Sequence, residues 1–243
     1  MRRLGIVGGL DWQSTVIYYE VINREIREAC GGQASAAMLI DSLNFQPFAS
    51  ASTSAEFQHL RETLVASSQA LEAAGVDGIL LACNTLHRFS QSIVNQINIP
   101  FLHIVDATAA ELLQDGHRRV GLLGTRATME SAFYKKKLTK EYQLDVLIPE
   151  KPQRDQLNHA IIHDLNTHGG TERIRELLNA TIATMSQQGA TAVILGCTEL
   201  GLAWGNRKEK VLELTLPAYD SAILHALEGA AFCRGKSPIP KKT

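Results

Sequence analysis

The hydrophobic positions of this chain form short apolar runs, separated by longer stretches in which apolar residues recur every three or four positions. The short runs predict strands at Arg3–Val7, Ala36–Leu43, Gly78–Ala82, Phe101–Ile104, Arg119–Leu123, Leu144–Ile148, Ala192–Leu195 and Leu212–Thr215. The longer stretches, such as the one that contains Ile174, Leu178 and Ile182, are typical of amphipathic helices. This alternation predicts an α/β fold with mainly parallel sheets.

The second half of the chain repeats the first at a nearly constant offset. Three pairs of segments correspond in order: Gly5–Gly8 with Gly121–Gly124, Ala74–Thr85 with Gln188–Glu199, and Pro100–Asp106 with Pro217–Asp220. Each half contains a helix, a glycine suited to a left-handed cap, a buried strand and a cysteine where the strand ends. We therefore predict two lobes related by a pseudo-twofold axis, residues 1–105 with 217–243 and residues 106–216. The carboxyl ends of their sheets are expected to face a shared central cleft.

The overall composition is that of an ordinary globular protein. Its 243 residues are 45% hydrophobic, and 24 Lys and Arg balance 25 Asp and Glu to a net charge of -1. Because there is no basic stripe, we expect neither nucleic acid nor a membrane surface as partner, and a small molecule fits better. The chain has no apolar run of about 18 residues and begins without a signal-peptide pattern, so we expect a cytoplasmic protein.

Two of the four cysteines occupy corresponding positions in the repeat. Cys83 and Cys197 each end a predicted strand and precede a predicted helix, where free backbone N–H groups stabilise a thiolate or a bound carboxylate. Cysteines of a cytoplasmic protein are expected to be reduced. Two equivalent thiols suit inversion of a stereocentre, because one thiolate removes the Cα proton while the other thiol donates a proton from the opposite face. This pattern indicates a racemase or epimerase.

The chemistry constrains the geometry of such a site. Each sulfur should lie about 3–3.5 Å from the reacting carbon, which places the two sulfurs about 7 Å apart and too far apart for a disulfide. Developing enolate charge needs hydrogen-bond donors around the substrate carboxylate. The main-chain amides of Asn84, Thr85, Thr198 and Glu199 are the predicted donors.

Two other functions remain open on the sequence. One is a one-thiol decarboxylase or isomerase of a small dicarboxylate, in which one cysteine is dispensable. The other is a catalytically inactive amino-acid-binding protein of the same fold.

Several further residues have both a functional and a structural interpretation. The glycines of Gly5–Gly9 do not follow G-x-G-x-x-G, so a tight turn explains them better than a dinucleotide. Cys83 and His87 have metal-ligand spacing without a second pair, and we expect no metal or other cofactor. His87 and His103 are interpreted as polar residues at the lobe boundary, with His103 on a buried strand. Cys30 and Cys233 are expected to be packing residues, whereas Asp106 and Asp220 can either cap helices or orient groups in the cleft.

Three motifs together resemble those of a known family. They are Ala82-Cys83-Asn84-Thr85 with Gly196-Cys197-Thr198-Glu199, the opening Gly8-Gly9-Leu10-Asp11-Trp12-Gln13-Ser14-Thr15, and Gly124-Thr125-Arg126-Ala127-Thr128-Met129. The chain resembles the cofactor-independent aspartate/glutamate racemases from Leu4 to about Ala230, and most closely the aspartate and broad-specificity amino-acid racemases. The resemblance implies two flavodoxin-like lobes, a two-thiol proton transfer without pyridoxal phosphate or metal, and a homodimer.

The resemblance also assigns roles to residues. Cys83 and Cys197 match the acid–base pair. Positions that bind the substrate or line the cleft match Leu10, Ser52, Asn84, Thr85, Thr125, Thr128 and Thr198, and Glu199 matches the neighbour that tunes Cys197. Members that act on acidic substrates anchor the side-chain carboxylate with Arg or Lys, but residues 44–54 and 162–164 contain neither. The substrate is expected to be aspartate or a broader range of amino acids, and the missing anchors argue against aspartate and for neutral polar or varied side chains. Arg126 and His163 are the cationic groups that could still reach the site.

Overall fold

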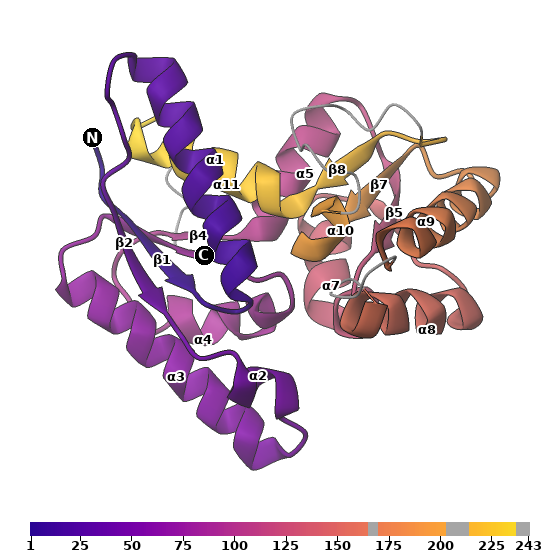
Figure 1. The fold of residues 1–243 in the computed structure, drawn as a ribbon, viewed down its shortest axis with the longest axis horizontal. Coiled ribbons are helices and arrows are strands. Elements are labelled where there is room, and N and C mark those ends of the chain that lie inside the picture. Colours follow the sequence, from indigo (N-terminus) through magenta and orange to yellow (C-terminus); the bar gives the residue numbers. More distant parts are fainter. Residues whose placement is uncertain (165–169, 203–213, 237–243) are drawn as a thin grey trace. The chain divides into compact units, whose positions relative to one another are not determined.

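The computed structural model describes residues 1–164, 170–202 and 214–236, without the side chains of Thr171, Glu199 and Leu202 (Figure 1). The chain divides into two compact units, residues 1–104 with 225–243 and residues 105–224. Each unit contains one four-stranded sheet in which all strands are parallel. The predicted α/β class with parallel sheets is confirmed.

The first unit has the sheet order β2-β1-β3-β4. Its elements are β1 (Leu4–Gly8), α1 (Trp12–Cys30), β2 (Met38–Ser42), α2 (Gln46–Ser50), α3 (Ser54–Ala73), β3 (Gly78–Leu81), the 3₁₀ turn η1 (Thr85–Phe89), α4 (Ser90–Val94), β4 (Phe101–Leu102) and the larger part of α11 (Ser221–Cys233). Helix α3 covers one face of the sheet and α1 the other (Figure 1). Buried residues on the α3 side, such as Leu64, Ile79 and Leu81, form one apolar cluster. On the α1 side, Gly229 of α11 lies against Leu4 and Ile22.

The second unit has the equivalent sheet order β6-β5-β7-β8. Its elements are α5 (Ile104–Gln114), β5 (Arg119–Leu123), α6 (Arg126–Glu130), α7 (Ala132–Glu141), β6 (Asp145–Leu147), α8 (Lys151–His159), the π-helical turn η2 (Ala160–Asp164), α9 (Gly170–Gln187), β7 (Ala192–Leu195), α10 (Thr198–Leu202) and β8 (Ala218–Asp220). The apolar side of α9, which includes Ile174, Leu178 and Ile182, packs on Val193 and Leu195. The helical spacing in the sequence predicts this buried side correctly.

Corresponding residues of the two units make equivalent main-chain hydrogen bonds. The N–H of Ala82 donates to Val7 O at 2.9 Å, and the corresponding N–H of Gly196 donates to Leu123 O at 2.6 Å. The glycines that end the helices before β3 and β7 both have positive φ, 80° at Gly75 and 89° at Gly189. Residues that correspond by position therefore also have the same backbone roles, which confirms that the two sheets are built from repeated units.

Two predictions on the last part of the second unit need correction. The predicted strand Leu212–Thr215 lies partly outside the described residues, and its described part forms a bend. The eighth strand is instead β8, which pairs in parallel with β7. The second correction concerns the boundary between the two units. Since β8 is part of the second sheet, residues 217–224 belong to the second unit, and the first unit resumes at His225 and not at residue 217 as predicted. Among the described helices, none is both long and apolar enough to cross a membrane.

Candidate active site

The first thiol lies where the central strand β3 ends. The N–H of Cys83 donates to Leu81 O at 2.9 Å, which turns the chain out of the sheet. The Cys83 side chain is half-buried against the apolar cluster under α3. The 3₁₀ turn η1 follows at Thr85, where the sequence predicts the start of a helix, and α4 begins only at Ser90.

The second thiol has the equivalent place in the other unit. Cys197 lies between β7 and α10, one residue after Gly196, and its carbonyl accepts from the N–H of Leu200 at 3.1 Å. Its side chain is only 6% exposed and belongs to the apolar cluster under α9. The two thiols thus share a topological position but differ in burial.

The predicted binding residues next to the thiols lie in their own units. Asn84 and Thr198 are buried, with 4% and 5% exposure, and Thr85 is half-buried. The side chain of Glu199 lies outside the described residues. In each unit, polar groups therefore adjoin the thiol along the chain, as the sequence predicts.

The predicted loop residues Thr125 and Thr128 lie beside the second thiol's strand end. Thr125 caps α6, because its hydroxyl accepts from the N–H of Thr128 at 3.3 Å. A Cβ placed on Gly196 would lie 2.9 Å from the Thr128 side chain. The absence of a side chain at Gly196 therefore lets the Thr125–Thr128 loop approach the backbone that leads into Cys197.

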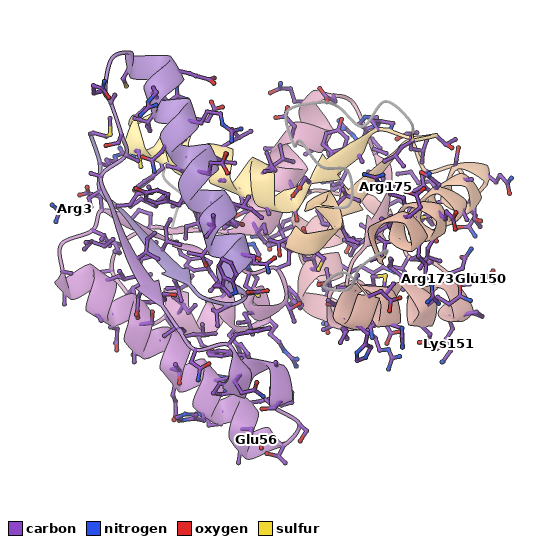
Figure 2. All side chains as sticks on the ribbon, viewed as in Figure 1. Arg3, Glu56, Glu150, Lys151, Arg173 and Arg175 are labelled. Atoms are coloured by element: carbon purple, nitrogen blue, oxygen red, sulfur yellow. The ribbon has the colours of Figure 1, made fainter. Side chains whose placement is uncertain are left out.

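Leu10 and Ser52 have different surroundings in the first unit. Leu10 is 2% exposed and packs in the apolar cluster under α3, so its side chain acts as core in this structure. Ser52 is exposed, and its N–H and hydroxyl both donate to the carboxylate of Glu56, at 2.8 and 3.3 Å. Figure 2 shows Glu56 at the N-terminal end of α3. Hydrogen bonds from Ser52 and Thr53 lower the pKa of Glu56 to about 2, so this loop carries a fixed negative charge.

Comparison with known proteins identifies the family. The sequence profile of the Asp/Glu/hydantoin racemases matches residues 7–228. The chain belongs to this racemase family. Two solved structures, a candidate Asp/Glu racemase from Yersinia pestis and an aspartate racemase homologue from Pyrococcus horikoshii OT3, are each 31% identical to it and cover 96% of this chain and 100% of their own. Their TM-scores are 0.87 and 0.81.

A curated relative matches a shorter part of this family member. The broad-specificity amino-acid racemase of Bacillus subtilis is 29% identical over 145 residues, which are 60% of this chain and 62% of that protein. The match therefore spans less than two thirds of that relative's length.

A histidine cluster in the first unit of this racemase-family protein is only partly visible in the sequence. His87 is 1% exposed, and its ring contacts the rings of His103 and His225, with centroids 4.7 and 5.5 Å away. His103 lies just after β4 rather than on it. The third member, His225, lies on α11. The only sign of it in the sequence is a polar residue within an apolar helical stretch. Its burial and the nearby His87 lower its pKa well below the usual value.

The two aspartates left open by the sequence have structural partners. The carboxylate of Asp220 accepts from the N–H groups of Ala222 and Ile223, at 3.0 and 3.2 Å, and so caps α11. Asp106 accepts from the Tyr142 hydroxyl at 2.8 Å and pairs with Lys137 at 2.9 Å. The helix-cap interpretation therefore holds for Asp220, while Asp106 joins α5 to α7.

The structure also shows the surroundings of the two other cysteines and of the two cationic residues named in the sequence analysis. Cys233 is fully buried, and burial raises its pKa to about 11, as expected of a packing residue. Cys30 is exposed, so its interpretation as a packing residue is wrong. Arg126 pairs with Asp155 at 2.9 Å, and the ring of His163 lies against that of His159. Within residues 1–164, 170–202 and 214–236, no three His, Cys, Asp or Glu side chains are grouped to hold a metal ion.

Proposed function

We propose that this protein is a pyridoxal-phosphate-independent amino-acid racemase in which Cys83 and Cys197 exchange protons with the same substrate carbon. The observation that supports this most strongly is the equivalence of the two thiols. Each follows the central strand of its sheet, after a residue whose N–H donates to the neighbouring strand, from Ala82 to Val7 and from Gly196 to Leu123. A site that uses a single nucleophile does not need a second thiol at the matching position of a repeated unit.

The proposed reaction moves one proton in and one out. The thiolate of one cysteine takes the Cα proton, the electron pair is delocalised into the substrate carboxylate, and the thiol of the other cysteine protonates the opposite face of Cα. The product then leaves with the two cysteines in exchanged protonation states, ready for the opposite enantiomer.

The charge that develops on the carboxylate needs fixed donors. We assign this role to the main-chain N–H groups of Asn84, Thr85, Thr198 and Glu199, which follow the thiols directly. Thr125 and Thr128 are placed beside Cys197 by the close approach of their loop to Gly196. Leu10 and Ser52 complete the proposed set from the first unit.

The substrate is aspartate or a broader range of amino acids, and the charge of the first unit favours the broader range. Residues 44–54 contain no Arg or Lys. The carboxylate of Glu56 is bonded to Ser52 in the same loop, and its low pKa keeps it negative at neutral pH. A substrate side-chain carboxylate would therefore find no counter-charge in this loop, which a neutral or cationic side chain does not need. As further parts of this proposal, the enzyme is a homodimer, as the family resemblance implies, and works in the cytoplasm.

The experiment that tests the function is racemisation by single-cysteine variants, followed by chiral chromatography from both enantiomers. Positioned acid–base groups contribute about 10²–10⁴-fold each, so Cys83→Ala and Cys197→Ala should each lower the rate by at least about 10³-fold. Cys30→Ala is the matched control, because Cys30 is exposed and has no counterpart in the repeat. Full activity in either active-site variant would refute the two-thiol mechanism. Loss in only one of them, with turnover of a dicarboxylate, would favour the one-thiol decarboxylase or isomerase.

A further inference from the structure

The turn that carries Cys83 is held by a side chain whose role the repeat does not predict. The ring of His87 contacts Cys83 O through Nδ1, at 2.7 Å, and its Nε2 lies 3.2 Å from the N–H of Ile104. A main-chain N–H can only donate, so Nε2 must be the acceptor. The proton of the neutral ring is therefore on Nδ1, where it donates to the Cys83 carbonyl. One ring thus joins the turn after β3 to the residue that begins α5.

The surroundings of the ring keep it in place. His87 is 1% exposed, and the rings of Phe101, His103 and His225 lie with centroids 5.7, 4.7 and 5.5 Å from its own. His225 is itself fixed, because its Nε2 bonds to Leu102 O at 3.0 Å. In a close-packed interior a ring held on all sides has one orientation, so the anchor on Cys83 is rigid.

The hydrogen bond also determines the direction of a neighbouring amide. The carbonyl of Cys83 and the N–H of Asn84 belong to the same planar peptide group. Fixing the carbonyl therefore fixes the N–H of Asn84, on the opposite side of the peptide bond. This N–H is one of the donors that we assign to the substrate carboxylate, so the anchor sets both the thiol-bearing residue and its adjacent donor.

The second unit has a different residue at the position that corresponds to His87. The residue that corresponds to His87, 114 positions later, is Gly201. The carbonyl of Cys197 accepts instead from the N–H of Leu200, at 3.1 Å, within the helical turn that follows it. The carbonyl of Cys197 is thus bonded to the main chain, whereas the carbonyl of Cys83 is bonded to the ring of His87.

We propose that His87 is a positioning residue for the Cys83 turn, acting as the neutral tautomer protonated on Nδ1. Its effect on racemisation rests on the proposed function, but its effect on the turn does not. Removing the donor to Cys83 O should loosen residues 82–87 in the first unit and leave residues 196–201 in the second unchanged.

Two substitutions separate the two hydrogen bonds of the ring. The amide nitrogen of Asn reaches the position of Nδ1, so His87→Asn keeps the donor to Cys83 O. The amide oxygen of Gln reaches the position of Nε2, so His87→Gln keeps the acceptor for Ile104 and loses the donor. Because a small misplacement of reacting groups costs on the order of 100-fold in rate, His87→Gln should lower kcat by about that factor. His87→Asn should stay within about tenfold of the wild type.

Hydrogen exchange measured by mass spectrometry gives a readout that does not depend on activity. In His87→Gln the peptide 82–87 should exchange at least about tenfold faster than in the wild type, while peptide 196–201 serves as the internal control. Faster exchange in both peptides would mean general destabilisation and overturn the proposal, as would unchanged exchange in peptide 82–87. If no amino acid is racemised but only peptide 82–87 loosens, the proposed function fails and the positioning role stands.

A measurement on the wild type remains decisive if the variants fail to fold. The ¹⁵N shifts of the His87 ring distinguish the two neutral tautomers, and the geometry predicts protonation on Nδ1. Protonation on Nε2 would overturn the proposal, because that ring cannot accept from Ile104.

Discussion

Acidification should destabilise the first unit through His225. This side chain is fully buried, and its Nδ1 accepts from the Tyr18 hydroxyl at 3.0 Å while its Nε2–H donates to Leu102 O at 3.0 Å. Burial holds the pKa of His225 well below 6.5 in the folded state, and the nearby His87 lowers it further. A protonated ring would present two donors, so Nδ1 could no longer accept from the Tyr18 hydroxyl.

The sign and size of the effect follow from proton linkage. Since the pKa is lower in the folded state, the unfolded chain binds more protons, and the free energy of unfolding decreases as the pH falls below the unfolded value of about 6.5. The contribution of His225 is fully present above that pH. Below it, the loss approaches about 1.4 kcal/mol per pH unit until the folded pKa is reached.

The assay is urea unfolding at pH 7.5, 6 and 5 for the wild type and for His225→Gln. Glutamine retains an N–H donor for Leu102 O but cannot be protonated in this range. The other titrating groups are common to both proteins, so the difference between the two pH dependences isolates His225. Between pH 7.5 and pH 5 the wild type should lose more free energy of unfolding than the variant, at a slope of up to about 1.4 kcal/mol per pH unit below about pH 6.5. Parallel pH dependences would refute the reasoning.

Two further predictions concern the fold that supports the site. Gly9→Ala should destabilise the protein by at least about 2 kcal/mol, because Gly9 has a φ of 81° and an added Cβ would collide with the carbonyl of Leu43. Thermal unfolding is the assay, and Gly32→Ala is the control, since Gly32 also has positive φ but faces open space. Equal losses of stability in the two variants would contradict the role of the collision. Leu178→Ala should cost about 2–5 kcal/mol by removing a fully buried side chain of α9. Val16→Ala, at a half-exposed position on α1, should change stability by less than about 0.5 kcal/mol, and similar effects at the two sites would argue against the assigned core.

The parts of the fold that the sequence predicts are those determined by local pattern. Strands β5 and β7 have the predicted bounds because each is a run of apolar residues between turn signals. The last strand shows the limit of this method. Apolar character favours 212–215, whereas the repeat places Pro217–Asp220 opposite Pro100–Asp106 and so points to β8. For this last strand the internal repeat gives the correct position and the apolar run does not. The equivalent strands β4 and β8 pair with the equivalent strands β3 and β7.

The candidate site can be predicted from the sequence only where its residues are neighbours along the chain. The thiols and the polar residues that follow them are visible as short motifs. The cluster of Tyr18, His87 and His225 is not, since Tyr18 and His225 are 207 positions apart and meet only through tertiary packing. The role of Asp106 is hidden for the same reason, because its partners Lys137 and Tyr142 come from a different helix.

The proposed enzyme inverts amino acids by proton exchange at Cα. The most direct test is NMR in deuterated buffer with single L- and D-amino acids, including Asp, Glu, Asn, Gln, Ser, Ala, Met, Arg and Lys. Deuterium is expected at Cα together with the opposite enantiomer, starting from either form, and neutral or cationic side chains should react at least as well as acidic ones. Folded protein with reduced thiols that leaves Cα protonated and the configuration unchanged across all of them would contradict the proposed function.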